Sequence, residues 1–147
     1  MIWIGCDPGK KGAYAAIFED HVEVWPWDDV FFVSFLHGLL ATGDGIAACV
    51  EKVGAFSGQG VKSMFTFGRE FGFIEGALQM AGISYQLVPP KKWKSEYGLG
   101  SDKTQSVEVC KKLFPGINLR RTNKCTTDSA DEAEALLMAL YAKRHFG

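Results

Sequence analysis

The sequence predicts an α/β fold with a five-stranded mixed sheet, three antiparallel strands and then two parallel ones, flanked by helices. Two observations predict it. The first three apolar segments are joined by short turns, whereas helical stretches separate the later ones. The chain has 147 residues, of which 47% are hydrophobic and 22% charged. This size and composition suit one globular domain over residues 1–147.

The first part of the chain is expected to form an antiparallel meander. Residues 1–6 are an apolar segment that ends at the turn Asp7-Pro8-Gly9, and residues 13–18 are a second one that ends at Glu19-Asp20. Residues 21–27 alternate apolar and polar side chains, like a strand with one solvated face. Turns this short favour antiparallel pairing of neighbouring strands.

Helices and strands are expected to alternate in the remainder of the chain. Asp28 can cap a helix that ends at Gly43, and Gly82 can end a helix over residues 61–81. Apolar strands are expected at residues 46–50 and 83–88, the second one stopped by two prolines. Two more helices are expected, one from Ser101 or Asp102 to Phe114 and one from Thr126 or Thr127 to Arg144.

The charge of the chain is unevenly distributed. The net charge is −1, but residues 91–124 carry nine basic and three acidic residues, and residues 125–147 carry two and four. A basic segment beside an acidic one is expected where polyanion binding and cation binding share a domain. We find no signal-peptide pattern and no apolar run of membrane-helix length, and the four cysteines are scattered. We therefore expect a cytoplasmic protein with reduced thiols and no membrane partner.

Two carboxylates end apolar strands. Asp7 follows the first strand and Glu51 follows the fourth. If these strands are parallel neighbours, both side chains emerge at the carboxyl edge of the sheet, where open α/β sheets place their sites. Either residue alone also suits ordinary turn chemistry.

The last expected helix adds two more carboxylates. Asp128 and Asp131 are three residues apart, which places them on one helical face. The same face continues through a stripe of small side chains that would let the helix pack closely on the sheet: Ala135, Ala139 and Ala142. We attribute Glu132 and Glu134 to the helix dipole, which favours acids near a helix N-terminus.

Four converging carboxylates require a cation. At about 4 Å and an effective dielectric constant near 20, each like-charged pair costs about 4 kcal/mol. Oxygen ligands without histidine or cysteine favour Mg²⁺ or Mn²⁺ over zinc. Two such ions about 3.5–4 Å apart are the arrangement used for phosphodiester hydrolysis.

The chain resembles the RuvC-like Holliday-junction resolvases of the RNase H-like superfamily. The motifs are spread over nearly the whole chain in the family's order: Ile2-Trp3-Ile4-Gly5-Cys6-Asp7-Pro8-Gly9 with Gly12-Ala13, Val50-Glu51-Lys52-Val53, Gly58-Gln59-Gly60-Val61 with Phe67-Gly68 and Gly72, and Asp128-Ser129-Ala130-Asp131-Glu132-Ala133. The stretch before the last motif is similar to a phage-type branch: Val88-Pro89, Trp93-Lys94, Lys103 and Leu113-Phe114-Pro115.

This resemblance implies an RNase H-like fold and a crossover junction endonuclease. It implies that Asp7, Glu51, Asp128 and Asp131 are catalytic, metal-binding residues, and that a homodimer cuts two opposing strands of a four-way DNA junction. Bacterial members are usually longer and place an aromatic wedge soon after the second acid, where this chain offers only Phe56. We expect Phe56 to contact the DNA.

Basic residues surround the route into the final motif. We expect phosphate contacts from Lys91, Lys92, Lys94, Lys103, Arg120, Arg121 and Lys124. Several such contacts would make binding strongly salt-dependent. Because no base-reading motif is evident, recognition of branched shape is expected.

The helix over residues 61–81 bears apolar side chains around most of its circumference, which predicts burial on more than one side. Gly68, Gly72 and Gly76 recur every four residues and permit close approach of another backbone. Core packing and a two-fold dimer interface both explain this pattern.

Three alternatives stay open from the sequence. The Asp7-x-Gly9-x-x-Gly12 pattern also resembles the phosphate loop of actin-like ATPases and sugar kinases, but those need two lobes around a nucleotide. A non-cleaving DNA-binding scaffold of the same fold would not need all four acids. A related nuclease acting on flaps, forks or RNA–DNA hybrids would need the same residues.

Overall fold

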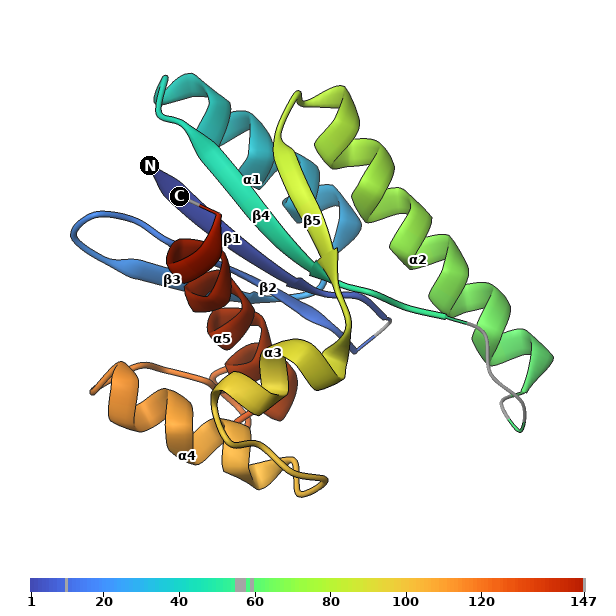
Figure 1. The fold of residues 1–147 in the computed structure, drawn as a ribbon, viewed down its shortest axis with the longest axis vertical. Helices are drawn as coiled ribbons and strands as arrows, with labels where there is room; N and C mark the ends of the chain where they lie inside the picture. Colours follow the sequence, from blue (N-terminus) through green and yellow to red (C-terminus); the bar gives the residue numbers. More distant parts are fainter. Residues whose placement is uncertain (10, 55–57, 59, 147) are drawn as a thin grey trace.

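A computed structural model describes residues 1–9, 11–54, 58 and 60–146. Its five-stranded sheet has the order β3-β2-β1-β4-β5, and helices cover both faces (Figure 1). The elements are β1 (Ile2–Asp7), β2 (Ala13–Ile17), β3 (Val22–Pro26), α1 (Asp29–Ala41), β4 (Ile46–Glu51), α2 (Val61–Met80), β5 (Ser84–Val88), α3 (Pro90–Glu96), α4 (Thr104–Leu113) and α5 (Ala130–His145).

The predicted mixed sheet is confirmed. β1 and β3 each pair antiparallel with β2, and β4 pairs parallel with both β1 and β5. In the parallel pair of β1 and β4, Cys6 lies opposite Val50. The two strands therefore end at the same edge of the sheet, with their last residues at the same level.

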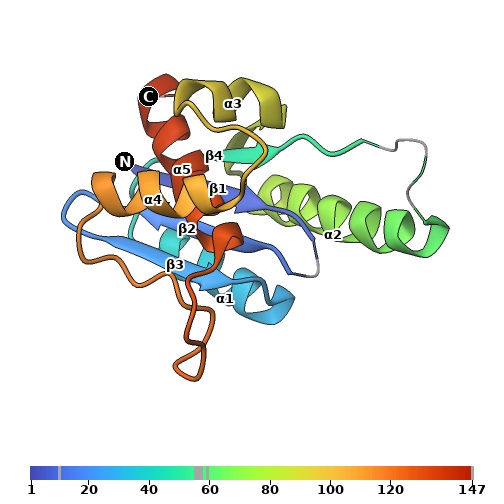
Figure 2. The same ribbon diagram turned by 90° about the horizontal axis from the view of Figure 1, so that it is seen from below.

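Two hydrophobic layers enclose the sheet. Helices α1 and α2 pack on one face, around Ile4, Phe32 and Ile74, whereas α3, α4 and α5 cover the other face (Figure 2). The second layer includes Trp93, Cys110 and Leu136, all fully buried. Helix α5 thus lies between the sheet and α4, which explains why ten of its 16 residues are buried.

Helix α5 packs against β1 at backbone distance. A Cβ atom added at Gly5 would lie 2.0 Å from the carbonyl oxygen of Ala135 and 2.4 Å from the backbone nitrogen of Ala139. The predicted alanine stripe therefore has the expected role, because only small side chains on both elements allow this approach. The first turn of α5 is thereby held beside the end of β1.

The start of α5 differs from the prediction. The helix begins at Ala130, and the Ser129 side chain accepts a hydrogen bond from the backbone N–H of Glu132 at 3.3 Å, so Ser129 is the N-cap in place of Thr126 or Thr127. Asp128 therefore precedes the helix. The expectation that Asp128 and Asp131 share a helical face is wrong for this reason.

Helix α3 was not expected from the sequence. The sequence indicates only a strand stop at Pro89 and Pro90, but Pro90 occupies the first turn of a helix, where a missing N–H costs nothing. This short helix follows β5 directly and carries Trp93 to the carboxyl edge of the sheet.

Within the described part of the chain, helix α2 is packed on one side only, so core packing does not provide the expected burial of a second side. Ile74 and Leu78 are its buried residues, whereas Phe65 and Met80 are 73% and 91% exposed. A Cβ atom added at Gly68, Gly72 or Gly76 would meet no described atom within 4 Å.

No helix in the described part of the chain is long and apolar enough to cross a membrane.

Candidate metal centre

The ends of β1 and β4 place two carboxylates side by side. Asp7 is the last residue of β1 and Glu51 the last of β4, and the parallel register brings both to the same edge. The predicted convergence of these two strand ends is confirmed. Asp7 is only 7% exposed, because α5 covers β1.

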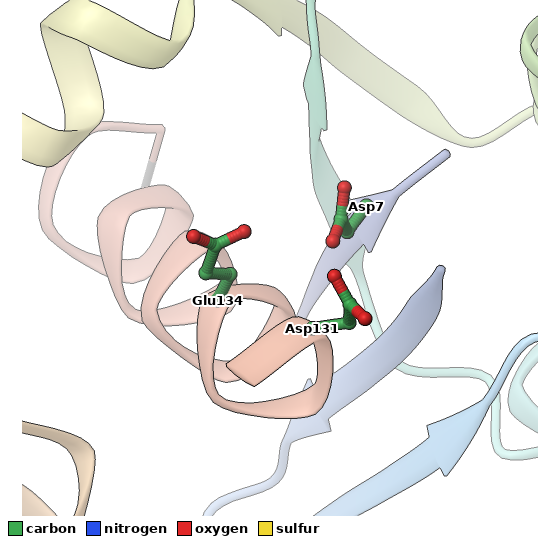
Figure 3. Close-up of side chains that lie close together, drawn as sticks. All are labelled: Asp7, Asp131 and Glu134. Carbon is green, nitrogen blue, oxygen red and sulfur yellow. The ribbon is translucent and has the colours of Figure 1, made fainter. Parts of the chain in front are cut away.

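Helix α5 brings two further carboxylates to Asp7. Asp131 and Glu134 lie in its first turns, and one carboxylate oxygen from each of Asp7, Asp131 and Glu134 lies within 4.8 Å of the other two. In Figure 3, the three side chains point toward a common space between the end of β1 and α5. Glu134 is 5% exposed, and the Asp131 side chain is 30% exposed.

Three of the four carboxylates at this edge have a partner on their outer side. The indole N–H of Trp93 donates to Glu51 Oε2 at 2.9 Å, and Lys94 Nζ lies 3.6 Å from Glu134 Oε1. Adjacent residues of α3 thus hold two different acids. Arg121 Nη2 donates to Asp131 Oδ2 at 3.3 Å. These partners restrict the side-chain orientations of the three acids.

Burial and mutual repulsion raise the proton affinity of the group. The pKa of Asp7 is well above its usual value, chiefly because burial disfavours the anion, and Glu51, Glu134 and Asp131 add to the shift. Burial also raises the pKa of Glu51 and of Glu134, whereas the Trp93 hydrogen bond and Lys94, respectively, oppose it. A bound cation would relieve the same repulsion.

Asp128 lies apart from the group of three. Its carboxylate pairs with Lys111 Nζ of α4 at 2.5 Å. The structure therefore brings together Asp7, Asp131 and Glu134, with Glu51 beside them, and directs Asp128 toward α4.

Glu134 is the member that the sequence interpretation missed. The sequence alone indicates only a favourable interaction with the helix dipole, a role that any acid in a first turn can fill. Glu134 follows Asp131 by the same three-residue spacing that drew attention to Asp128. With the helix start moved to Ala130, this spacing identifies Asp131 and Glu134 as the pair on one face.

The basic residues predicted to bind DNA fall into two groups. Exposed ones are Lys91, Lys92, Lys103, Arg120 and Lys124. Lys94 and Arg121 are partly buried and already contact acids of the site. Phe56 lies outside the described residues.

Helices on both faces of a mixed sheet, with acids at the carboxyl ends of its central strands, define an RNase H-like α/β fold. Two solved structures share it nearly end to end. A structure described as Thermus thermophilus RuvC in complex with Holliday junction substrate has a TM-score of 0.61 and 18% identity over 99% of this chain and 96% of that one. A second, described as Thermus thermophilus RuvC, has a TM-score of 0.54 and 16% identity over 98% and 96%.

The chain therefore has a RuvC-like fold. No family model matches the sequence, and no curated protein matches it.

Proposed function

We propose that this protein is a metal-dependent, structure-selective DNA endonuclease that resolves four-way junctions by phosphodiester hydrolysis. The observation that carries the proposal is the buried group of Asp7, Asp131 and Glu134 at the carboxyl edge of a RuvC-like sheet. Both the solved structure with a junction substrate and the motif order in the sequence favour DNA over other phosphodiesters. The phage-type motifs favour a role in DNA recombination in the cytoplasm of an infected bacterium.

The donor set fits hard divalent cations. The described ligand atoms of the group are carboxylate oxygens, and Mg²⁺ and Mn²⁺ prefer oxygen ligands. We propose that Asp7, Glu51, Asp131 and Glu134 hold two such ions. When bound, these ions would supply an activated water and neutralise the charge that develops on the leaving oxygen.

The protein side chains would supply orientation and charge. Trp93 and Lys94 fix Glu51 and Glu134 from α3. Lys103 is exposed, and its positive charge partly opposes the upward pKa shifts of Asp7, Glu51 and Glu134. Its ammonium group therefore lies within electrostatic range of all three carboxylates. We propose that Lys103 contacts the phosphate next to the scissile bond.

The remaining exposed cations would bind the arms of the junction. Lys91 and Lys92 lie on α3, the helix whose Trp93 and Lys94 contact the acidic group, and Arg120 and Lys124 lie on the segment between α4 and α5. Each phosphate contact contributes about 0.9 to the salt slope for duplex DNA. We propose a shape-selective surface, to which Phe56 adds an aromatic contact.

We further propose a homodimer that pairs through α1 and α2. An open apolar cavity of about 540 Å³ lies between these helices and is lined by Val33, Leu40, Phe73, Gly76 and Met80 among others. The α2 glycines meet no described side chain of their own chain, so packing within the described chain does not account for them. A two-fold dimer matches a substrate that is cut at two symmetry-related points.

A cleavage panel tests the function. Labelled four-way junction, fork, flap, linear duplex and RNA–DNA hybrid are incubated with the protein in Mg²⁺ or in EDTA. We expect paired, symmetric incisions of the four-way junction in Mg²⁺ only. Asp7→Asn is the inactive control and, because it removes like-charge repulsion, should leave metal-free thermal stability unchanged or raised.

The other outcomes are distinguishable. Preferential cutting of a flap, fork or hybrid would assign the site to a different nuclease substrate. Tight junction binding without cleavage in Mg²⁺ or Mn²⁺ would indicate a scaffold. An Asp7→Asn variant that cuts at the normal rate would contradict the role of Asp7.

A further inference from the structure

Arg121 joins two parts of the site that are far apart in the sequence. It lies in the segment between α4 and α5, and its guanidinium group contacts the β1–β2 turn as well as α5. Arg121 Nη2 donates to the backbone carbonyl of Lys11 at 2.5 Å and to Asp131 Oδ2 at 3.3 Å. Arg121 Nη1 lies 3.5 Å from the carbonyl oxygen of Gly12.

The β1–β2 turn is coupled to Asp7 through its backbone. A Cβ atom added at Gly12 would lie 2.0 Å from the carbonyl oxygen of Asp7, so the two backbones are in direct contact. The Gly12 N–H donates to the Gly9 carbonyl at 2.9 Å, and the Gly12 carbonyl accepts from the Trp27 N–H at 2.9 Å. A group that holds the Lys11 and Gly12 carbonyls therefore also restrains the end of β1.

The chemistry of the contact requires a guanidinium group. Arginine presents five N–H donors in a rigid planar fork, whereas the lysine ammonium is a compact charge on a flexible stem. The Arg121 fork spans two backbone carbonyls and one carboxylate at once. Its neighbour Arg120 is exposed.

We infer that Arg121 is a positioning residue: it fixes Asp131 of α5 relative to the turn that follows Asp7, and thereby sets the separation of these two carboxylates. This inference rests on the proposed metal site and assigns Arg121 to that site in place of the phosphate contact expected from the sequence. Outer partners of metal ligands contribute about 10–100-fold to metal affinity or activity.

The test compares Arg121→Lys with Arg144→Lys, because both variants keep the charge and Arg144 lies at the opposite end of α5 from Asp131. Mn²⁺ binding is measured by calorimetric titration without DNA, and junction binding is measured separately in EDTA. We expect Arg121→Lys to weaken Mn²⁺ binding about 10–100-fold and to leave junction affinity within about twofold of the wild type. Arg144→Lys should leave both unchanged.

Cleavage kinetics supply a second readout. In Arg121→Lys, kcat should fall at low Mn²⁺ concentration and recover as the Mn²⁺ concentration is raised. KM for the junction should stay unchanged. Thermal unfolding is measured in EDTA for each protein, so that all assays are run at a temperature at which every compared protein is folded. If Arg121→Lys does not fold, Arg121→Gln is measured in its place, with the same expected loss of Mn²⁺ affinity.

Two results would overturn the inference. Normal Mn²⁺ affinity in a folded Arg121 variant would remove the positioning role, and weakened junction binding with normal Mn²⁺ affinity would return Arg121 to the DNA surface. A wild-type protein that binds no Mn²⁺ would instead refute the proposed metal site, and the inference with it.

Discussion

Asp128 and Glu134 lie in different surroundings, although each is three residues from Asp131. Glu134 is 5% exposed and faces Asp7, whereas Asp128 is paired with Lys111 on α4. Glu134→Gln keeps the shape of the side chain and removes the anion that would bind metal. We expect kcat for junction cleavage to fall by about 100-fold or more.

Asp128→Asn is the matched control, because it makes the same change at the position that the sequence motif indicated. Its kcat should stay within about threefold of the wild type, since a partly exposed ion pair contributes little. The reverse result, in which Asp128→Asn is inactive and Glu134→Gln is active, would restore Asp128 to the site and exclude Glu134.

Glu132 makes the stability of the metal-free protein pH-dependent. It is 1% exposed, its Oε1 atom has no hydrogen-bond partner in the described structure, and burial raises its pKa to about 7 from 4.5. The folded state therefore holds a proton that the unfolded state releases. The contribution of Glu132 to the free energy of unfolding should fall as pH rises from about 4.5 to about 7, and level off above that.

Glu132→Gln removes the contribution of Glu132 to this dependence, because the amide is neutral at every pH. In EDTA at pH 8, we expect it to raise the free energy of unfolding by up to roughly 3 kcal/mol, with little effect at pH 4.5. Denaturant unfolding at both pH values measures the difference, with Glu108→Gln at an exposed position of α4 as the control. Equal effects of Glu132→Gln at the two pH values would contradict the assignment.

At the scale of elements, the site depends on how closely α5 approaches β1. Gly5→Ala would place a methyl group 2.0 Å from the Ala135 carbonyl oxygen, and backbone on both sides limits relaxation. We expect a loss of about 3 kcal/mol or more in the free energy of unfolding, at the upper end of overpacking effects. Mn²⁺ affinity should fall as well, because α5 carries Asp131 and Glu134.

Gly38→Ala in α1 is the control for this change. A Cβ atom there meets no described atom within 4 Å, and alanine is favoured over glycine inside a helix. It should therefore stabilise the protein by about 0.5–1 kcal/mol. A Gly5→Ala variant of normal stability would show that α5 does not need this close packing.

The elements also show where local sequence patterns are insufficient. The strands were predictable because apolar runs and turn residues act locally, as at Asp7-Pro8-Gly9. Helix α3 was not predictable, because two consecutive prolines are equally compatible with the end of a strand and with the start of a helix. The start of α5 was misplaced because Thr126, Thr127 and Ser129 are all competent N-caps, and only tertiary packing selects Ser129.

At the scale of the whole molecule, the apolar face of α1 and α2 predicts dimerisation. Leu40 and Met80 line its cavity and are 44% and 91% exposed, so charge at these positions should cost the monomer little. We expect the wild type to have twice the chain mass in light scattering and the double variant Leu40→Glu/Met80→Glu to be monomeric. Leu113→Glu, at an exposed apolar position of α4, is the control and should remain dimeric.

The candidate site was predictable only in part, for a reason that lies in the tertiary fold. Asp7 and Glu51 were found because each ends an apolar strand, a signal that needs no tertiary contact. Glu134 was overlooked because its significance depends on which face of α5 meets β1. The contacts of Trp93, Lys94 and Arg121 with the acids were not predictable either. Trp93 and Lys94 are distant in sequence from their partners Glu51 and Glu134, and a loop separates Arg121 from Asp131, so no local pattern encodes these contacts.

The most direct test of the metal site is anomalous X-ray scattering from crystals grown or soaked with Mn²⁺. The account predicts a strong anomalous peak between the end of β1 and α5, within direct coordination distance of carboxylate oxygens of Asp7, Asp131 and Glu134. A protein that binds Mn²⁺ elsewhere and shows no peak among these side chains would contradict it.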